Sequence, residues 1–160
     1  MKPLGLFIIF LASVSMLPVL SLEVTQVKVG SNPWAVSINP GTNKVYVTNF
    51  GNDSVSVIDG STNTVIKNVT VGDSPTGVEA NPSTGMVYVS RFSSPVVTVI
   101  DGKTDAVSAN VTVGSKPDGI GVNPLTNQVY VTNMGSATVS VIDGKTNAVS
   151  GTIKVGLRPT

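Results

Sequence analysis

Apolar and polar residues alternate in short runs along most of this chain. In Gln128–Asn133, for example, Val129 and Val131 alternate with Tyr130 and Thr132. A period of two residues places the two valines on one face of a strand. Runs of this kind are separated by segments rich in Asn, Asp, Gly and Pro, the residues that favour turns. The pattern therefore predicts an all-β protein built of short antiparallel strands.

The whole pattern recurs at a constant step of 42 residues, which separates Val29 from Val71 and Val71 from Val113. Four such pairs mark the repeats: Val29-Gly30, Val71-Gly72, Val113-Gly114 and Val155-Gly156. A repeat of this length with four short strands is typical of a β-propeller blade. We therefore predict three full blades, each a four-stranded antiparallel meander, at about 31–72, 73–114 and 115–156, within a domain that spans 22–160.

The third repeat shows the expected strands most clearly. We expect them at 119–123, 128–133, 138–143 and 148–155, from the inner to the outer edge of the blade. The two hairpin turns of each blade end on residue types that tolerate a left-handed backbone. These residues are Asn43, Gly85 and Asn127 in the first turn, and Asn63, Asp105 and Asn147 in the second.

Three blades make an incomplete ring, because closed propellers have about 4–8 blades. One further outer strand is expected from Val24 onward, ahead of the first full blade. The open faces of the end blades predict either self-association of copies or further propeller blades. A partial member of a larger propeller is at least as good an interpretation as a complete protein.

Composition excludes several classes of function. Only 12% of the residues are charged and the net charge is +1, so no basic surface for nucleic acid is expected. Because the sequence has no His and no Cys, it offers no imidazole base, no thiolate and few metal ligands. We therefore expect no catalytic residue, no metal site and no cofactor. Asp59, Asp101 and Asp143 recur before Gly, which suggests either calcium ligands or, far more simply, turn-stabilising carboxylates.

The first residues have the features of a secretory signal. Lys2 precedes the uncharged apolar run Leu4–Leu17, and Pro18 interrupts it. We expect a signal peptide at 1–21 with cleavage after Ser21, or alternatively after Ser15. An uncleaved anchor over Leu4–Leu22 is the other interpretation. No membrane span is expected once the signal is removed, so the chain is predicted to be secreted or held at the cell surface.

Three Asn-x-Ser/Thr triplets fit the glycosylation pattern, at Asn52, Asn68 and Asn110. Asn68 and Asn110 occupy the same place in successive repeats, on a predicted outer strand. The alternative is that these triplets arise by chance in a chain rich in Asn and Thr.

Residues that differ between repeats are the candidates for ligand binding. Trp34, Asp53, Arg91 and Asp118 fall in connections that are expected to meet at one mouth of the central channel, with Glu79 projecting into the channel beneath them. Aromatic and Arg side chains dominate recognition sites. The structural alternative is that Glu79 and Arg91 pair with each other and that Trp34 covers an end blade.

The run Tyr46-Val47-Thr48-Asn49, repeated as Tyr130-Val131-Thr132-Asn133, resembles the YVTN family of β-propeller repeats. The second repeat departs from this signature, with Ser90-Arg91 in place of Thr-Asn. The resemblance implies repeats like those of archaeal surface-layer proteins and exported bacterial propellers, with a structural or adhesive role. It supplies no catalytic motif.

We therefore expect an exported structural or interaction protein of the cell surface, not an enzyme, with a cell-envelope or carbohydrate partner. The alternative is an exported ligand-binding or hydrolase-like propeller with its site at the channel mouth.

Overall fold

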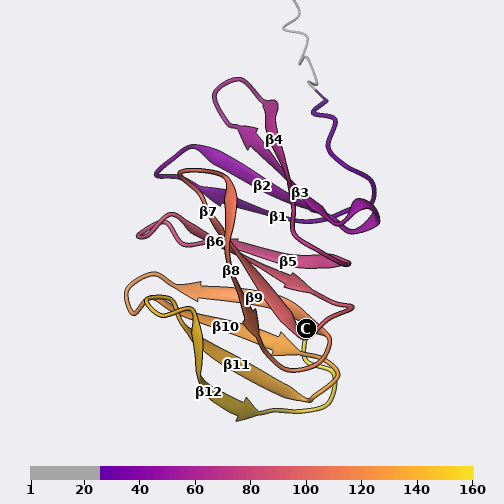
Figure 1. Cartoon of the computed structure of the whole chain (residues 1–160), viewed down its shortest axis with the longest axis vertical. Coiled ribbons are helices and arrows are strands. Elements are labelled where there is room, and N and C mark those ends of the chain that lie inside the picture. The colour runs from indigo at the N-terminus through magenta and orange to yellow at the C-terminus, as the bar shows by residue number, and fades with distance from the viewer. Residues whose placement is uncertain (1–25) are drawn as a thin grey trace, which may run out of the picture.

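The computed structural model describes residues 26–160. These residues form twelve strands and one 3-10 helix, arranged as three four-stranded sheets (Figure 1). The first sheet contains β1 (Pro33–Asn39), β2 (Lys44–Asn49), β3 (Ser54–Asp59) and β4 (Thr64–Thr70), with the helix η1 (Phe50–Asn52) after β2. The second contains β5 (Pro75–Ala80), β6 (Met86–Arg91), β7 (Val96–Asp101) and β8 (Ala106–Thr112). The third contains β9 (Pro117–Asn123), β10 (Gln128–Asn133), β11 (Thr138–Asp143) and β12 (Ala148–Lys154).

Each sheet is an antiparallel meander in which neighbouring strands follow one another along the chain. We call the three sheets blade 1, blade 2 and blade 3. The register is the same in each, so that Tyr46 pairs with Val57 and Tyr130 pairs with Val141. The prediction of three all-β propeller blades of four strands is confirmed. In blade 3 the observed strands match the predicted ones within two residues at every end.

The hairpin turns confirm the reasoning from residue type. All six residues expected to be left-handed have positive φ angles, between 51° and 80°. They are Asn43, Gly85 and Asn127 in the first turns, and Asn63, Asp105 and Asn147 in the second. Asn and Asp accept this conformation more readily than other residues with a Cβ atom. The turn residues therefore fix where each strand ends and the next one starts.

The blades stack face to face, and the apolar sides of the strands form two separate cores. Between blades 1 and 2, Tyr46 and Val57 pack against Val78 and Val89. Between blades 2 and 3, Tyr88 takes the place of Tyr46 one repeat later and packs against the next blade in the same way. Both tyrosines are fully buried. The repeat in sequence thus produces a repeated interface.

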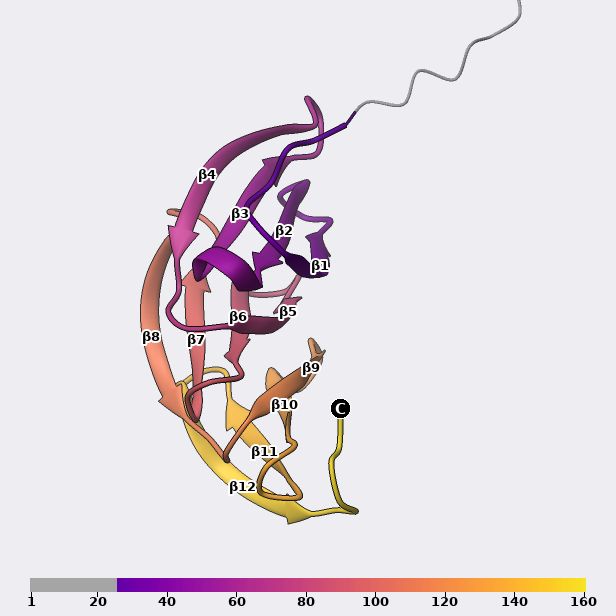
Figure 2. The same cartoon turned by 90° about the vertical axis from the view of Figure 1, so that its right-hand side faces the viewer.

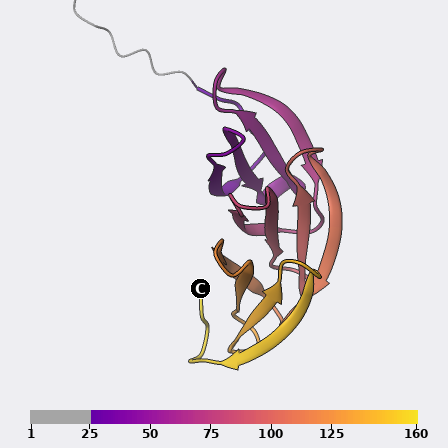
Figure 3. The same ribbon diagram turned by 90° about the vertical axis from the view of Figure 1, so that its left-hand side faces the viewer.

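The stack curves into an open arc (Figures 2 and 3). The outer strands β4, β8 and β12 lie along the convex side, and the inner strands β1, β5 and β9 lie along the concave side. The ring is not closed. Two blade faces therefore have no neighbouring blade among the described residues. We call them the first end face, on blade 1 (Val36, Ile38, Val45 and Val47), and the last end face, on blade 3 (Tyr130, Val139, Ile153 and Val155).

Two of the predictions concern the start of the chain. An outer strand was predicted from Val24, but Gln26–Val29 forms no strand, and this prediction is wrong for these four residues. A strand needs a paired neighbour, and Gln26–Val29 pairs with none of the strands of the described blades. The predicted signal at 1–21 lies outside the described residues. Within 26–160, no helix has the length and apolar character needed to cross a membrane.

Candidate functional site

A cleft at one edge of the arc gathers six residues from all three blades. We call it the rim cleft, and its volume is about 260 Å³. Three of its residues stand at the starts of the inner strands, and three directly follow the second strands. The six are Trp34, Thr76 and Asp118, and Phe50, Phe92 and Met134.

Hydrogen bonds between two connections build this rim in the same way in each blade. The residue before each inner strand is left-handed, with φ of 50° at Asn32, 54° at Ser74 and 50° at Lys116. Its carbonyl oxygen accepts a hydrogen bond from the backbone of the apolar residue after the second strand. The bonds are Phe50 N to Asn32 O at 2.9 Å, Phe92 N to Ser74 O at 3.0 Å, and Met134 N to Lys116 O at 2.9 Å. Backbone geometry therefore places Phe50, Phe92 and Met134 side by side along the rim.

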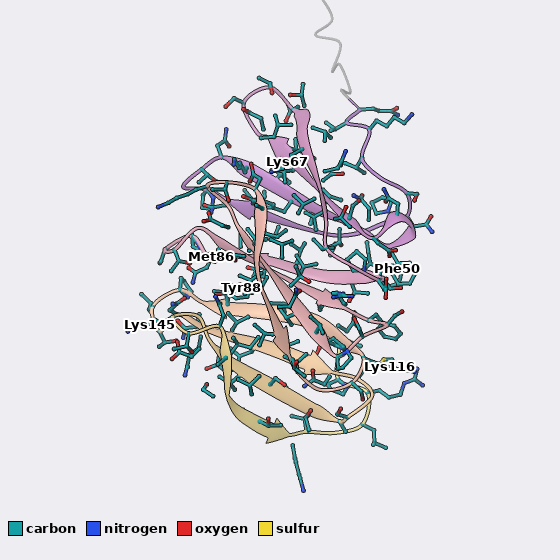
Figure 4. The ribbon with its side chains drawn as sticks, viewed as in Figure 1. Phe50, Lys67, Met86, Tyr88, Lys116 and Lys145 are labelled. Carbon is teal, nitrogen blue, oxygen red and sulfur yellow. The ribbon has the colours of Figure 1, made fainter. Side chains whose placement is uncertain are left out.

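The rim cleft is mostly apolar and aromatic. The rings of Trp34 and Phe50 lie 5.5 Å apart between centroids, in a tilted arrangement. The Lys116 ammonium lies 5.7 Å from the centre of the Phe92 ring, within the range of a cation–π contact. Figure 4 shows Phe50 and Lys116 on the same side of the stack, opposite Met86 and Lys145. Asp118 is the only carboxylate that lines the cleft.

The structure brings Trp34 and Asp118 together in the rim cleft but does not bring Asp53 or Arg91 there. Asp53 Oδ1 accepts a hydrogen bond from Ser74 N at 2.9 Å, and its backbone oxygen accepts one from Val71 N at 3.0 Å. Asp53 thus fastens the connection between blades 1 and 2. This carboxylate therefore stabilises the loop, and Asp53 does not line the rim cleft.

Arg91 likewise contacts the connection between blades 1 and 2 and does not line the rim cleft. Its guanidinium lies against Gly72, in the place where Asn49 and Asn133 lie against the equivalent glycines of the other blades. Arg91 Nη2 lies 4.0 Å from Asp73 Oδ2. The expected alternative of an ion pair between Glu79 and Arg91 is not observed among the described residues, where Arg91 meets Asp73 instead.

Glu79 lies on β5, partly buried at the joint between blades 1 and 2. Its Oε2 accepts a hydrogen bond from Ser37 Oγ at 3.3 Å. Burial raises the pKa of the Glu79 carboxyl above its usual range, and the Ser37 hydrogen bond opposes that effect. Glu79 does not line the rim cleft.

The repeated aspartates stabilise turns. Asp59 Oδ1 accepts hydrogen bonds from Ser61 N at 2.7 Å and Thr62 N at 3.2 Å, which lower the pKa of this carboxyl. Asp101 and Asp143 each accept one such bond from the backbone two residues later, at 2.8 Å. In 26–160 no group of three or more acidic side chains is placed to hold a metal ion.

The three candidate glycosylation residues are exposed. Asn68 Oδ1 accepts from Ser56 Oγ at 2.8 Å, and Asn110 Oδ1 accepts from Thr98 Oγ1 at 2.9 Å. Both bonds use the amide oxygen, whereas a glycan is joined to the amide nitrogen. Asn52 Oδ1 is bonded to Ser31 N at 3.1 Å.

Reasoning from the sequence missed Phe50, Phe92 and Met134. It sought function only where the repeats differ, whereas these three apolar residues recur at the same repeat position. Their signal was present, because a large apolar residue follows a predicted strand end in each repeat, at a place where turn residues are usual.

No protein-family model and no curated protein matches this chain. Among solved structures, it is similar to hydrazine synthase of Kuenenia stuttgartiensis, with a TM-score of 0.75 and 22% identity over 86% of this chain and 41% of that one. It is also similar to AztD from Citrobacter koseri in two structures, both with a TM-score of 0.66. The AztD identities are 19% and 18%, over 78% of this chain and 35% of that one.

The chain thus spans less than half the length of each of these proteins. At these identities the similarity shows the β-propeller fold alone.

Proposed function

We propose that this chain is an exported structural or interaction protein of the cell surface, built of YVTN-type propeller repeats, and that it acts by binding and not by catalysis. The observation that carries the proposal is the pair of apolar end faces. Ile38 on the first end face is 60% exposed, whereas its equivalent in blade 2, Ala80, is 3% exposed. A surface whose repeat equivalents are buried between blades is suited to pack against another protein.

Export is supported by the sequence. Lys2 and the apolar run Leu4–Leu17 fit a secretory signal, and the resemblance to surface-layer repeats points the same way. The exposed amides of Asn68 and Asn110 on the convex side would carry glycans away from the stack. A non-catalytic role is supported by a sequence that contains neither His nor Cys.

Cell fractionation and intact-mass measurement test this proposal. We expect a tagged full-length chain in the envelope or the medium, starting at Leu22. An Ile9→Asp variant, which places a charge in the apolar run, should stay inside the cell. An uncleaved chain in the membrane would favour the anchor, and wild-type protein retained in the cytoplasm would contradict export.

Glycosylation is tested on the same material. We expect extra mass that falls by the mass of one glycan in each of the Thr70→Val and Thr112→Val variants, because each change removes one Asn-x-Thr triplet and leaves its Asn in place. Blade 3 is an internal control, since Thr152 stands where the other blades carry Asn. A wild-type mass equal to that of the bare polypeptide would contradict this part of the proposal.

Binding of a carbohydrate in the rim cleft is the second candidate function. Trp34 and Phe50 offer apolar ring faces for a sugar, and the Asp118 carboxylate can accept hydrogen bonds from its hydroxyls. Trp34 is the single tryptophan of the chain, so its fluorescence reports on the cleft directly.

We expect a glycan array to give a hit that shifts the Trp34 fluorescence and is lost in a Phe92→Ala variant. Leu125→Ala is the matched control, because Leu125 is 96% exposed in a turn between β9 and β10 and does not line the cleft. Binding that survives the loss of both Trp34 and Phe92 would exclude this site.

A further inference from the structure

We propose that the partner of both end faces is a second copy of this chain. Blade 1 of each copy packs on blade 3 of the other, so that two copies share one six-bladed ring. A second copy as partner rests on the interaction role proposed above. It is tested by the mass of the protein in solution, which does not depend on where the protein is located in the cell. Six blades fall within the range of closed propellers. A two-fold axis makes the two new contacts identical, and we call each of them the closing contact.

The first end face has the composition of a blade interface and the exposure of a surface. Val36 is 62% exposed and Ile38 is 60% exposed. Their equivalents in blade 2, Val78 and Ala80, are 6% and 3% exposed because blade 1 covers them. Among residues 26–160, an apolar blade face thus stays exposed, with no other blade packed on it.

The last end face is the matching half of the same interface. Ile153 is 49% exposed, whereas its equivalent Val111 is 4% exposed against blade 3. Tyr130 is 37% exposed, whereas Tyr88 is fully buried. Each copy thus presents both halves of the contact that already joins its own blades.

A hydroxyl-to-carbonyl hydrogen bond supports a head-to-tail arrangement. Thr48 Oγ1 of blade 1 donates to Thr76 O of blade 2 at 2.7 Å. Ser90 Oγ, one repeat later, donates to Asp118 O of blade 3. The third member of this series is Thr132, and the matching acceptor is Trp34 O of the second copy. Within one copy Thr132 Oγ1 makes only the bond inside its own blade, to Gly119 O at 3.3 Å, which Thr48 and Ser90 make as well.

Side-chain volumes at the closing contact are complementary. Between blades 1 and 2, Ala80 N donates to Ser37 Oγ at 3.1 Å, so these two repeat positions meet across the joint. The same two positions at the closing contact are Gly121 and Ile38 of the second copy. A Cβ atom added at Gly121 would meet nothing within 4 Å. The missing side chain on one copy leaves room for the larger one on the other.

The amide side chains match as well. Asn81 Nδ2 of blade 2 donates to Asn127 Oδ1 of blade 3 at 2.8 Å. At the closing contact these positions are Asn123 and Asn43 of the second copy, so the amide pair is restored. Between blades 1 and 2 the position of Asn127 is Gly85, and the Asn39 amide nitrogen is buried without a partner. At this pair of positions the closing contact therefore has better polar complementarity than the joint between blades 1 and 2.

The C-terminal residues occupy part of the required space. Arg158 has a φ of 56°, like its equivalent Lys116, and Thr160 lies beside Gly119. Pro33 and Trp34 of a second copy would take the places of Pro159 and Thr160, which must move aside. Leu157, which is 90% exposed, marks where this short tail leaves the blade.

Sedimentation and light scattering of the chain from Leu22 onward, which includes every described residue, test the proposal. We expect twice the chain mass at micromolar concentration. Ile38→Asp and Ile153→Asp should each give monomers, because each variant has an Asp in both closing contacts. A Val107→Asp control, on the outer strand of blade 2, should remain dimeric. A monomeric wild type, or an Ile38→Asp dimer, would overturn the proposal.

Mixing the two monomeric variants gives the sharpest result. A mixed pair has one closing contact that is entirely wild type, and we expect dimers to reappear at a weaker affinity. A contact between two first end faces would leave Ile153→Asp dimeric, and open head-to-tail association would give a series of larger masses, so either result contradicts the ring. Deletion of residues 157–160 should leave the dimer intact or tighten it, and loss of the dimer would show that the tail itself makes the contact.

Discussion

Lys44 Nζ lies 2.7 Å from Asp105 Oδ2, and this ion pair joins β2 of blade 1 to the second turn of blade 2. The side chains are 19% and 10% exposed. Lys44 Nζ also donates to Gly102 O at 2.9 Å. Blade 3 carries Asn147 where blade 2 carries Asp105, and blade 2 carries Met86 where blade 1 carries Lys44, so the same two repeat positions are charged at one joint and uncharged at the next.

Asp105→Asn should lower the free energy of unfolding by about 2 kcal/mol, because it leaves the Lys44 charge largely buried without its partner. The substitution retains a residue type that accepts the left-handed φ of 51° at this position. The double variant Lys44→Met with Asp105→Asn copies the joint of Met86 and Asn147 and should recover most of the loss. Urea unfolding of the wild type, Asp105→Asn, Lys44→Met and the double variant measures the coupling, and additive effects would contradict it.

Gly72→Ala should destabilise the fold by about 2 kcal/mol or more. Gly72 has a φ of +95°, and a Cβ atom there would collide with the Arg91 guanidinium. Gly156→Ala is the control, because a Cβ atom at Gly156 would meet nothing within 4 Å. Thermal unfolding followed by circular dichroism compares them, and equal effects would contradict the clash.

Stability should fall as pH rises through the titration of Glu79. Burial raises the pKa of this carboxyl in the folded state, so the folded protein binds the proton more tightly than the unfolded chain does. The contribution of the protonated group is complete below the unfolded pKa near 4.5 and is lost as pH rises toward the higher folded value. Glu79→Gln should therefore gain stability over the wild type at pH 7, and the gain should vanish at pH 4. A constant difference at both pH values would contradict this assignment.

Alkaline unfolding should depend on Tyr46. Burial, and next the charge of Asp105, raise the pKa of Tyr46 to about 12. Because the unfolded phenol ionises near pH 10, the folded state loses stability as pH rises from about 10 toward 12. Tyr46→Phe should unfold at a higher pH than the wild type when the change in absorbance of tyrosinate is followed. Identical midpoints would show that Tyr46 does not control the transition.

The fold could be predicted from the sequence because each strand and turn pattern occurs three times, and an assignment that is ambiguous in one copy is decided by the others. Asn43 and Asn127 stand at the same step of one pattern, and each supports the assignment of the other. Ser74, Lys116 and Arg158 are also left-handed, yet their residue types give no such signal. For Ser74 and Lys116, the long-range bonds from Phe92 N and Met134 N to their carbonyl oxygens accompany this conformation. The rim connections were therefore predicted less accurately than the hairpins.

The candidate site could be predicted only in part, for a related reason. Trp34 and Asp118 were correctly placed near each other from their repeat positions. Arg91 was assigned to the same mouth, but its guanidinium fills the space beside Gly72. A side chain that long can reach several environments, and a strand position alone does not select between them.

The bonds from Thr48 and Ser90 to the next blade end on main-chain carbonyl oxygens, which every amino acid possesses. This hydrogen bond therefore does not depend on the side chain of the residue that accepts it. Duplication or loss of one 42-residue unit would therefore preserve this hydrogen bond at every remaining joint, whichever residue accepts it.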